Sequence, residues 1–477
     1  MTAAEGSATS AADRHVRILS FVTHAPRPRN VDELIERALS LGVDVIAAQG
    51  TSNDYGAYWL GSGEQTDTRR SLKENIRPYM KAAVSRDIPF VLSVGLAGAD
   101  IHLDEALCRV DELCEEEGWA LRLGILSGEI STEFLLEACD SGVPITAAHE
   151  HPSLSPLLTV EDINDTIRAV ALVGPEPIIE VLRNQVNGVI TGRALDIGLH
   201  MAIPMMMGIP RHVAAHAGKI IECGAAAAEG GSAHAPIWAE LDDDGFVVRS
   251  LDPVAPVTVR SVTAQAMYER SDPWLEVNPG GTLDLTQSSY IELERGVVRC
   301  EGARWIEAPY SVLVEGAKAA GHRSICIMGI RDSAVIENLD LLLEKMDAHL
   351  NTAPQLEGLT RGSDFELGVR VYGRDAVLGT YEPSPAIDGH EICLIIDTVA
   401  ATRELAQQVC LIAYGRIQSG DFPGRLTTAG NVSLPFMPIV HPVGPVYRYS
   451  IFHILPLEDY GAPFRTWISD FPRSEGG

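Results

Sequence analysis

The first half of the chain repeats one pattern, in which a short apolar run rich in β-branched residues is followed by a turn and an amphipathic helix. The apolar runs lie at residues 16–22, 43–48, 90–94, 120–126, 144–148 and 188–191. Helix-period segments span 31–41, 69–86, 103–117, 132–138, 160–172 and 194–201. Strands that are apolar on both faces are typical of a parallel sheet covered by helices on both sides. The alternation therefore predicts an α/β domain with a Rossmann-like parallel sheet.

The pattern changes near residue 235, where hairpins replace the strand–helix units. A D-D-D-G turn at 242–245 stands between two short apolar runs and predicts a β-hairpin. Further strand-like runs lie at 257–262, 290–293, 297–300, 311–314, 365–372 and 391–397, and helices are expected at 333–350 and 401–414. We expect an α/β domain over 15–235 and an α+β domain over 236–465. Residues 1–14 are expected to form a disordered tail, and 466–477 a second tail.

The balance of charges restricts the partners. The chain has 37 Lys and Arg against 65 Asp and Glu, a net charge of −28. A field of this sign repels phosphate backbones and anionic membrane surfaces, so we expect neither nucleic acid nor a membrane as partner. No apolar stretch approaches the ~20 residues needed to span a bilayer. A small anionic substrate requires a local pocket of Arg, Lys, backbone amides or metal.

The cysteines and the N-terminus indicate the compartment. No two of the 8 cysteines form a C-x-x-C pair, and several lie inside apolar runs, which is typical of buried reduced thiols. The first fourteen residues have no apolar segment of the kind found in signal peptides. Both features favour a cytoplasmic protein. We expect a homo-oligomer, with a small partner subunit as a further option.

In a doubly wound sheet, ligands bind beyond the carboxyl ends of the strands. That rule selects the loops at 49–56, 95–100, 149–151 and 191–196. None of them is a G-x-G-x-x-G loop after the first strand or a P-loop, so no nucleotide cofactor is expected. The cofactor stays unknown, and a divalent metal is one option.

One of these loops supplies the cation that an acidic chain needs for an anionic ligand. Gly192 and Arg193 follow a predicted strand, and Asp196 stands on the next turn. An arginine beside exposed helix amides forms a fork for a carboxylate or phosphate, and Asp196 would orient it. The alternative interpretation is an Arg–Asp pair that only caps the helix.

Two histidines invite a metal interpretation. His149 and His151 share one side of an extended segment and would suit zinc or iron together with a carboxylate. Pro152 follows directly, however, and loop histidines are commonly surface residues, so these two are weak metal candidates and no metal site is assigned.

An Ala/Gly-rich stretch holds two further candidates for chemistry. Glu222 and Cys223 lie within it, and Gly230 and Gly231 follow. A buried carboxyl has a raised pKa suited to proton transfer, which favours Glu222 as an acid or base. Cys223 is the weaker candidate, as a nucleophile, because a thiolate needs a stabilising base nearby. The alternative is close helix packing with Glu222 paired to an Arg.

Three polar loop residues complete the candidate substrate site. Asn53 lies after the second predicted strand, whereas Asn431 and Arg448 lie in turn-forming segments near the C-terminus. Such segments suit a loop that folds over a pocket, and a subunit interface is the alternative interpretation.

Several of these blocks resemble the acyclic terpene utilisation family, AtuA. They are V-I-T-G-R-A-L-D at 189–196, G-K-I-I-E-C-G at 218–224, the segment 430–435, and the short pieces at 283–284 and 302–303. The family reads much like V-I-T-G-R-x-x-D and G-H-L-L-E-C-G in the first two blocks. The resemblance extends from about residue 43 to 455, and the two longer blocks together are fairly specific.

The chain departs from the family pattern in three places. The loops at 49–55 and 93–96 differ from the family's G-D-Y-L-A-E-like and N-A-G-G-like loops, and Lys219 stands where the family commonly has His. If side chains at these positions carry the family's chemistry, the substrate differs or the activity is lost.

The resemblance implies a role in the catabolism of branched or unsaturated acids, as in terpene degradation. We expect a lyase, a hydratase or dehydratase acting on a small branched or unsaturated carboxylic acid or its acyl-CoA ester. Arg193 would hold the carboxylate, Asp196 would orient that guanidinium, and Glu222 would move the proton. Gly230, Gly231 and the Asn431 loop would line the pocket. Two alternatives stay open: a non-catalytic binding or structural subunit of a catabolic enzyme complex, and a metal-dependent hydrolase.

Overall fold

The structure is a computed structural model that describes residues 14–65, 69–384 and 389–473. The chain divides by compactness into a large unit, Met1–Lys318 with Tyr449–Gly477, and a small unit, Ala319–Arg448. The expected N-terminal tail lies outside the described residues except for Arg14. The domain boundary near residue 235 stays a prediction.

The large unit consists of strands and helices, and its first continuous stretch of chain ends with a long strand that continues into the small unit. They are β1 (Val16–Val22), α1 (Val31–Leu41), β2 (Val45–Gln49), α2 (Tyr58–Ser62), α3 (Arg69–Arg86), β3 (Phe90–Ser93), α4 (Asp100–Glu117), β4 (Leu121–Leu126), α5 (Thr132–Asp140), β5 (Thr146–Ala147), α6 (Val160–Asp165), β6 (Arg168–Ala171), α7 (Pro175–Leu182), β7 (Gly188–Thr191), α8 (Asp196–Met206), α9 (Arg211–Ile221), η1 (Gly224–Ala227), β8 (Ile237–Leu241), β9 (Gly245–Ser250), α10 (Val259–Met267), β10 (Leu275–Asn278), β11 (Gly281–Asp284), β12 (Ser289–Glu294), β13 (Val297–Glu301), β14 (Arg304–Glu307) and β15 (Ser311–Ile330).

The remaining elements build the small unit and then return to the large one. They are α11 (Ser333–Glu337), α12 (Leu339–Leu350), η2 (Pro354–Leu356), β16 (Phe365–Tyr372), η3 (Gly379–Tyr381), β17 (Ile392–Ala400), α13 (Arg403–Ser419), β18 (His441–Pro456) and β19 (Thr466–Phe471). The chain leaves the large unit along β15 and re-enters it along β18.

A ten-stranded mixed sheet forms the centre of the large unit, in the order β12-β13-β9-β8-β1-β2-β3-β7-β4-β19. The strands from β1 to β4 in this order are parallel, as the sequence predicts for the first half. Antiparallel strands extend the sheet on both sides, because β8 pairs with β1 and β19 pairs with β4. The α/β class is confirmed in this coarser form, and the Rossmann-like description stays a prediction.

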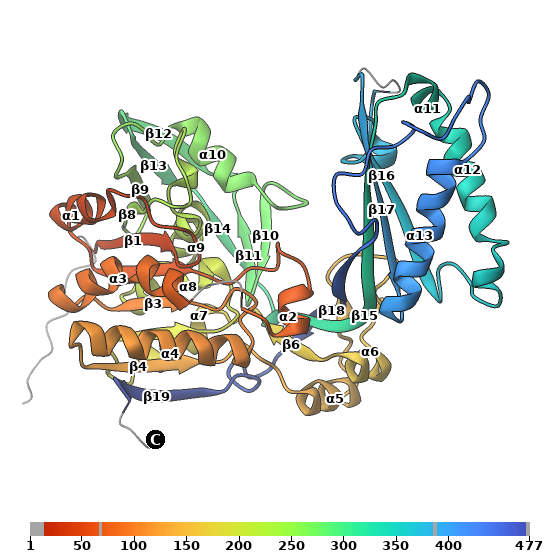
Figure 1. The fold of residues 1–477 in the computed structure, drawn as a ribbon. Coiled ribbons are helices and arrows are strands. Elements are labelled where there is room, and N and C mark those ends of the chain that lie inside the picture. Colours follow the sequence, from red (N-terminus) through yellow and green to blue (C-terminus); the bar gives the residue numbers. More distant parts are fainter. Residues whose placement is uncertain (1–13, 66–68, 385–388, 474–477) are drawn as a thin grey trace, which may run out of the picture. The chain divides into compact units, whose positions relative to one another are not determined.

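Helices cover both faces of the sheet. Residues of α1, α3 and α4 share one apolar core with Phe90 and Ile190, whereas residues of α7, α8 and α9 share another with Val91 and Val189. Figure 1 shows α3 and α4 across the strands. Neighbouring strands β3 and β7 are therefore followed by helices on opposite faces, α4 and α8. Such a change of side is where α/β sheets bind ligands.

Two sequence predictions of secondary structure are wrong, and one segment assigned to a tail is a strand. Only the first part of 160–172 is helical, because residues 168–171 form β6, which pairs with β15. Residues 257–262 were expected to be a strand but begin α10, because Thr258 and Ser261 form a capping box that starts a helix. Residues 466–471, placed in a C-terminal tail by the sequence, form β19, whose Phe471 is buried in the core.

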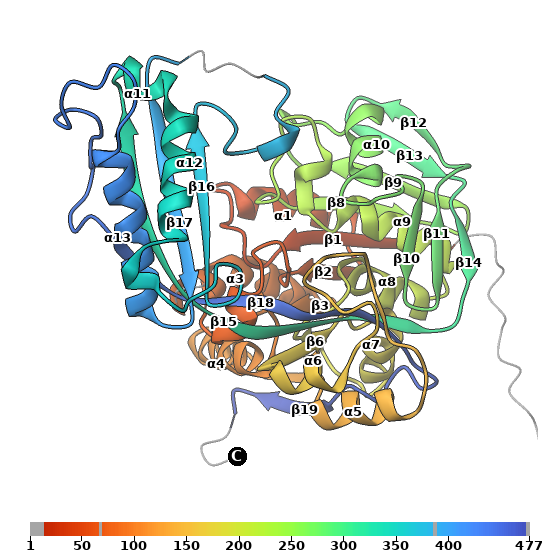
Figure 2. The ribbon, with the colours of Figure 1, turned by 90° about the vertical axis from the view of Figure 1, so that its right-hand side faces the viewer.

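The small unit has the element order β15, α12, β16, β17, α13, β18 and the strand order β16-β17-β15-β18. This is the βαββαβ arrangement of ferredoxin-like folds. Figure 2 shows α12 and α13 against β16 and β17. Both helices bury Leu342, Met346, Val409 and Ala413 in the core of this unit. The predicted helices at 333–350 and 401–414 are thereby confirmed, with a break at Asn338.

Glycines allow the loops after β3, β4 and β7 to pack against one another at the carboxyl edge of the sheet. A Cβ on Gly98 would overlap the backbone nitrogen of Arg193, and a Cβ on Gly128 would overlap the Arg193 carbonyl oxygen. A Cβ on Gly192 would overlap the Gly98 oxygen. The backbone of Arg193 is fixed by this contact, since its N–H donates to the Gly98 oxygen at 2.9 Å.

We expect Gly98→Ala to destabilise the large unit more than Gly118→Ala. Both glycines have a left-handed φ, 68° and 69°, which costs an alanine about 1–2 kcal/mol. Gly118 has open space around its missing Cβ, whereas an alanine at 98 must also displace backbone, which adds about 1–3 kcal/mol. Urea unfolding followed by circular dichroism measures the difference. Equal losses in the two variants would contradict the close packing of these loops.

Candidate functional site

A buried ion pair stands where the loops after the parallel strands meet. The Arg193 guanidinium forms a fork with Glu315, from Nε to Oε2 at 3.0 Å and from Nη2 to Oε1 at 3.1 Å. The two side chains are 5% and 3% exposed. The sequence predicted that Asp196 would orient this guanidinium and that the guanidinium would bind a substrate carboxylate. Glu315 of β15 is the hydrogen-bonded partner instead.

This ion pair also fixes the loop that follows β2. Arg193 Nη1 donates to the Thr51 carbonyl oxygen at 3.1 Å, and Asn53 Nδ2 donates to Glu315 Oε1 at 2.7 Å. The Tyr449 hydroxyl donates to the Asn53 carbonyl oxygen at 3.3 Å. Asn53, predicted to bind substrate, thus lies beside Arg193 and is held in place by Glu315.

Asp196 is the first residue of α8, and its carboxyl is incompletely satisfied. The Oδ1 atom is buried and has no hydrogen-bond partner among the described residues. Burial raises the pKa of Asp196 well above its usual range, against the lowering effect of Arg193 and Lys219; Glu315 and Asp54 add to the increase. A buried carboxyl without a partner favours its protonated form, because desolvation penalises the charge.

Lys219 and Glu222 bring a second pair of charges to the same place. Gly218 allows α9 to approach the first turn of α8, because a Cβ there would lie 3.1 Å from Cβ of Ile197. One turn of helix then separates Lys219 from Glu222, whose Oε1 accepts from Nζ at 2.8 Å. The ammonium also lies 4.2 Å from the ring centre of Tyr268, within the range of a cation–π contact.

Glu222 lies in a strongly desolvated environment. Burial raises the pKa of Glu222 well above its usual range, Asp196 and Glu276 raise it further, and Lys219 opposes the increase. The Tyr268 hydroxyl donates to Glu222 Oε1 at 3.4 Å. The sequence prediction of a buried Glu222 is confirmed, and its partner is a lysine rather than an arginine.

The structure places Cys223 next to these carboxyls but as a thiol. Burial, followed by the charge of Glu222, raises the pKa of Cys223 to about 12. Its Sγ lies 2.9 Å from the Tyr268 hydroxyl. A thiol with such a pKa is protonated at neutral pH, so its surroundings favour a hydrogen-bonding role over that of a thiolate nucleophile.

Two carboxyls of raised pKa and an ammonium lie at the place where the helices that follow neighbouring strands change from one face of the sheet to the other. Asp196 raises the pKa of Glu222, and Lys219 acts to lower the pKa of both carboxyls. A carboxyl that keeps a proton near neutral pH can give it to a substrate, and its neighbour can accept one. The chemistry available here is proton transfer.

The other predicted site residues have different surroundings. Gly192 is buried within the packed loops, and Gly230 and Gly231 form an exposed turn after η1. Asn431 and Arg448 belong to the small unit. Asn431 Nδ2 donates to the Gln418 oxygen at 3.3 Å, whereas Arg448 pairs with Glu366 of β16.

The two candidate metal ligands are exposed. The ring centres of His149 and His151 are 6.2 Å apart in an edge-to-face arrangement. His151 Nδ1 lies 2.7 Å from the Ser153 hydroxyl. Within 14–65, 69–384 and 389–473, no group of three or more His, Cys, Asp or Glu is arranged to hold a metal ion.

Sequence reasoning missed Glu315, Tyr268 and Glu276 as neighbours of this centre. Glu315 is 122 residues from Arg193 along the chain, so no local spacing relates the two. One signal was available: Glu315 is a lone acid in the apolar run that opens β15, and buried acids need a partner.

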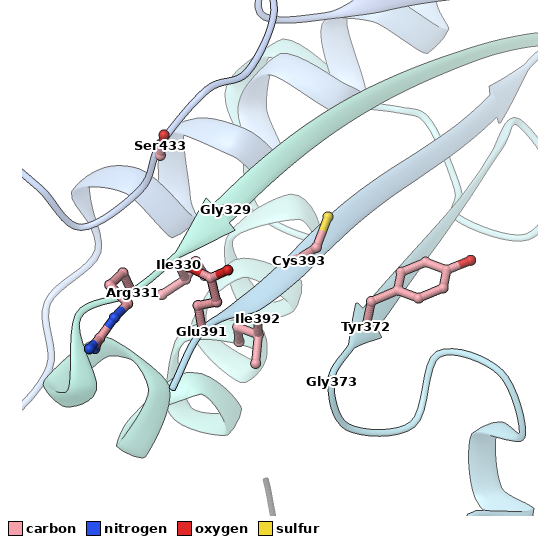
Figure 3. A pocket seen from close by; sticks show the side chains of 9 residues that line it. All are labelled: Gly329, Ile330, Arg331, Tyr372, Gly373, Glu391, Ile392, Cys393 and Ser433. Atoms are coloured by element: carbon pink, nitrogen blue, oxygen red, sulfur yellow. The ribbon is translucent and has the colours of Figure 1, made fainter. Parts of the chain in front are cut away.

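The small unit holds a pocket of its own, of about 600 Å³. Figure 3 shows it at the ends of β15, β16 and β17, with the charged side chains of Arg331 and Glu391 nearby. Cys393 also lines it, and Ser433 exchanges two backbone hydrogen bonds of 2.8 Å with Gly329. The Asn431 loop, predicted to line a pocket, therefore borders this one.

Comparisons with known proteins give one match. The model of the acyclic terpene utilisation family protein AtuA matches residues 27–425. No curated protein and no solved structure matches the chain. Among the helices of the described part of the chain, none has both the length and the apolar character to cross a membrane.

Removing the carboxylate of Glu315 should destabilise the protein strongly. In Glu315→Gln the Arg193 guanidinium stays buried without its counter-charge, which costs about 3–5 kcal/mol. The exposed pair of Arg249 and Glu294 offers a control, because Glu294→Gln should cost less than about 1 kcal/mol. Urea unfolding measures both values. A loss in Glu315→Gln no larger than in the control would contradict the structural role of the buried pair.

The raised carboxyl pKa values predict a sign for the pH dependence of stability. A carboxyl whose pKa is higher in the folded than in the unfolded chain stabilises the fold below its unfolded pKa, about 4. That contribution to stability is lost as the pH rises to the folded pKa. The stability of Asp196→Asn relative to the wild type should therefore increase between about pH 4 and about pH 7, where the folded carboxyl loses its proton.

Urea titrations at a series of pH values measure this difference for Asp196→Asn and Glu222→Gln. Glu229→Gln, which changes an exposed carboxyl near η1, serves as the control. A difference for Asp196→Asn that falls with pH would show that its pKa is lowered by Arg193 and Lys219 rather than raised by burial.

Proposed function

Because the chain belongs to the acyclic terpene utilisation family AtuA, we propose that it is a hydro-lyase acting on a small branched or unsaturated carboxylic acid or its acyl-CoA ester. Family membership suggests a role in acyclic terpene utilisation. The reaction class is our inference from the site. Addition of water to a carbon–carbon double bond needs one group that takes a proton from water and one that gives a proton to carbon.

One observation carries this proposal: two buried carboxyls with raised pKa values lie beside an ammonium at the carboxyl edge of the sheet. In the hydration direction, one carboxylate accepts a proton from water while the water oxygen bonds to one alkene carbon. The other carboxyl, protonated, donates to the second carbon. We assign the proton donor to Glu222 and the acceptor to Asp196, and the reverse transfers accompany dehydration.

The surrounding residues have positioning roles in this proposal. Lys219 bonds to Glu222 and limits the rise in the pKa of that carboxyl. Arg193 and Glu315 hold the Asn53 loop close to Asp196 without contributing a free donor. Gly192 lets the loops approach closely enough for this arrangement to form.

Glu222→Gln tests the proposal, because glutamine keeps the shape but cannot transfer the proton. We expect kcat to fall about 10²- to 10⁴-fold, with the far-ultraviolet circular dichroism spectrum unchanged. Glu229→Gln is the control and should keep full activity. The assay follows incorporation of oxygen from isotopically labelled water into a panel of branched unsaturated acids and their CoA esters.

The outcomes separate the proposal from its alternatives. Full activity in Glu222→Gln would refute the assignment of the proton donor. A purified wild-type protein that incorporates no labelled oxygen from any member of the panel, but gains activity on addition of a second protein, would favour a non-catalytic subunit. Activity that depends on added zinc, iron or manganese would favour the metal-dependent hydrolase.

A further inference from the structure

The large unit contains another largely buried guanidinium, that of Arg270, whose donors form no hydrogen bonds among the described residues. The Arg270 side chain is 7% exposed, and its Nε, Nη1 and Nη2 atoms have no hydrogen-bond partner among the described residues. Arg270 forms an ion pair with Glu276, whose Oε2 lies 3.0 Å from Nη2 and is itself without a hydrogen bond. Buried polar groups are normally satisfied, and a guanidinium left with free donors indicates a missing ligand.

Arg270 stands at the edge of the carboxyl pair. It follows Tyr268, whose hydroxyl contacts Glu222 and Cys223. Glu269, between the two, is exposed and has a φ of 58°, a left-handed conformation that is strained for a non-glycine residue. Strained backbone of this kind persists where the fold requires it, commonly at ligand sites.

The charge of Arg270 acts on the same helix that carries the proposed proton donor. Burial lowers the pKa of His216, and the charge of Arg270 lowers it further. The same charge opposes the rise in the pKa of Lys219, and both residues lie on α9. The N–H groups of the Arg193 guanidinium, by contrast, donate to Glu315 and to two backbone oxygens. Arg270 is therefore the guanidinium in this region that has donors to offer.

We propose that Arg270, together with Lys219, binds the carboxylate of a small monocarboxylic acid beside Glu222. The proposal rests on the hydro-lyase assignment in one respect, which is that the bound acid is taken to be the substrate of that reaction. A guanidinium presents parallel N–H groups that match the two oxygens of a carboxylate. Binding would satisfy donors that are otherwise buried and unpaired.

The local charge favours a monoanion over a phosphate. Arg270 and Lys219 contribute two positive charges, which Glu276 balances in part. Burial favours the neutral form of Glu222, so Glu276 and the proposed proton acceptor Asp196 are the negative charges nearby. A monoanion adds one further negative charge to this region, whereas a doubly charged phosphate would add two.

Methacrylate tests this site, with methacrylamide as its uncharged counterpart. Isothermal titration of the full chain should show binding of methacrylate, with methacrylamide at least about tenfold weaker, since a hydrogen bond to a charged group is worth about 1.5–3 kcal/mol. Arg270→Met should weaken methacrylate about 10- to 100-fold, and Arg270→Lys, which keeps the charge but loses the fork, about tenfold. Arg260→Met, at an exposed position of α10, is the matched control and should bind as the wild type does.

Glu276→Gln gives a second test that does not require removal of the buried cation. It removes the competing carboxylate from Arg270, so methacrylate should bind more tightly, while methacrylamide should be little affected. Equal binding of methacrylate by wild type, Arg270→Lys and Glu276→Gln would overturn the proposal, even if Arg270→Met fails to fold. Tighter binding of inorganic phosphate than of methacrylate would also overturn it.

The results remain distinct from those that test the hydro-lyase. Arg270-dependent binding of methacrylate without any incorporation of labelled oxygen would support the carboxylate site and count against the reaction. Loss of turnover in Glu222→Gln, with methacrylate binding unchanged in every Arg270 variant, would support the reaction and refute the carboxylate site.

Discussion

The buried ion pair of Arg193 and Glu315 is the interaction on which the rest of the candidate site depends. Two charges removed from water are stable only when their remaining donors and acceptors are satisfied. Here the carbonyl oxygens of Thr51 and Ala194 and the amide of Asn53 satisfy them. Three separate chain segments are thereby tied together: the loop after β2, the loop after β7 and the start of β15.

The position of that ion pair determines the environment of the carboxyls next to it. Asp196 follows Arg193 by three residues and begins α8, while the close contact of α8 and α9 brings Glu222 near. Both carboxyls are desolvated, and Lys219 compensates them only in part. A protein with a net charge of −28 thus maintains a small region in which carboxyls favour their protonated forms and cations are buried. Affinity for an anion would come from short-range contacts there, not from the field of the whole molecule.

Much of the fold was predictable because it depends on local periodicity. The strands 16–22 and 188–191 and the helices 31–41 and 69–86 have the same limits in the sequence analysis and in the structure. The errors arose where a local signal was overruled or overlooked. The capping box at Thr258 begins a helix in a run whose composition is typical of a strand. Residues 168–171 form β6 because they pair with β15, and the periodicity of the segment does not indicate that pairing.

The sequence by itself determined the coarse α/β class of the fold and predicted Arg193, Asp196 and Glu222 as candidate site residues. These predictions depend on the spacing of residues along the chain, because a strand or helix places residues of a given spacing on the same face. The tertiary structure alone decided the partners: Glu315 for Arg193, Lys219 for Glu222, and Glu276 for Arg270. The reason is physical, because pairing and pKa depend on which charges are buried together, and residues more than a hundred positions apart share a site only after the chain has folded.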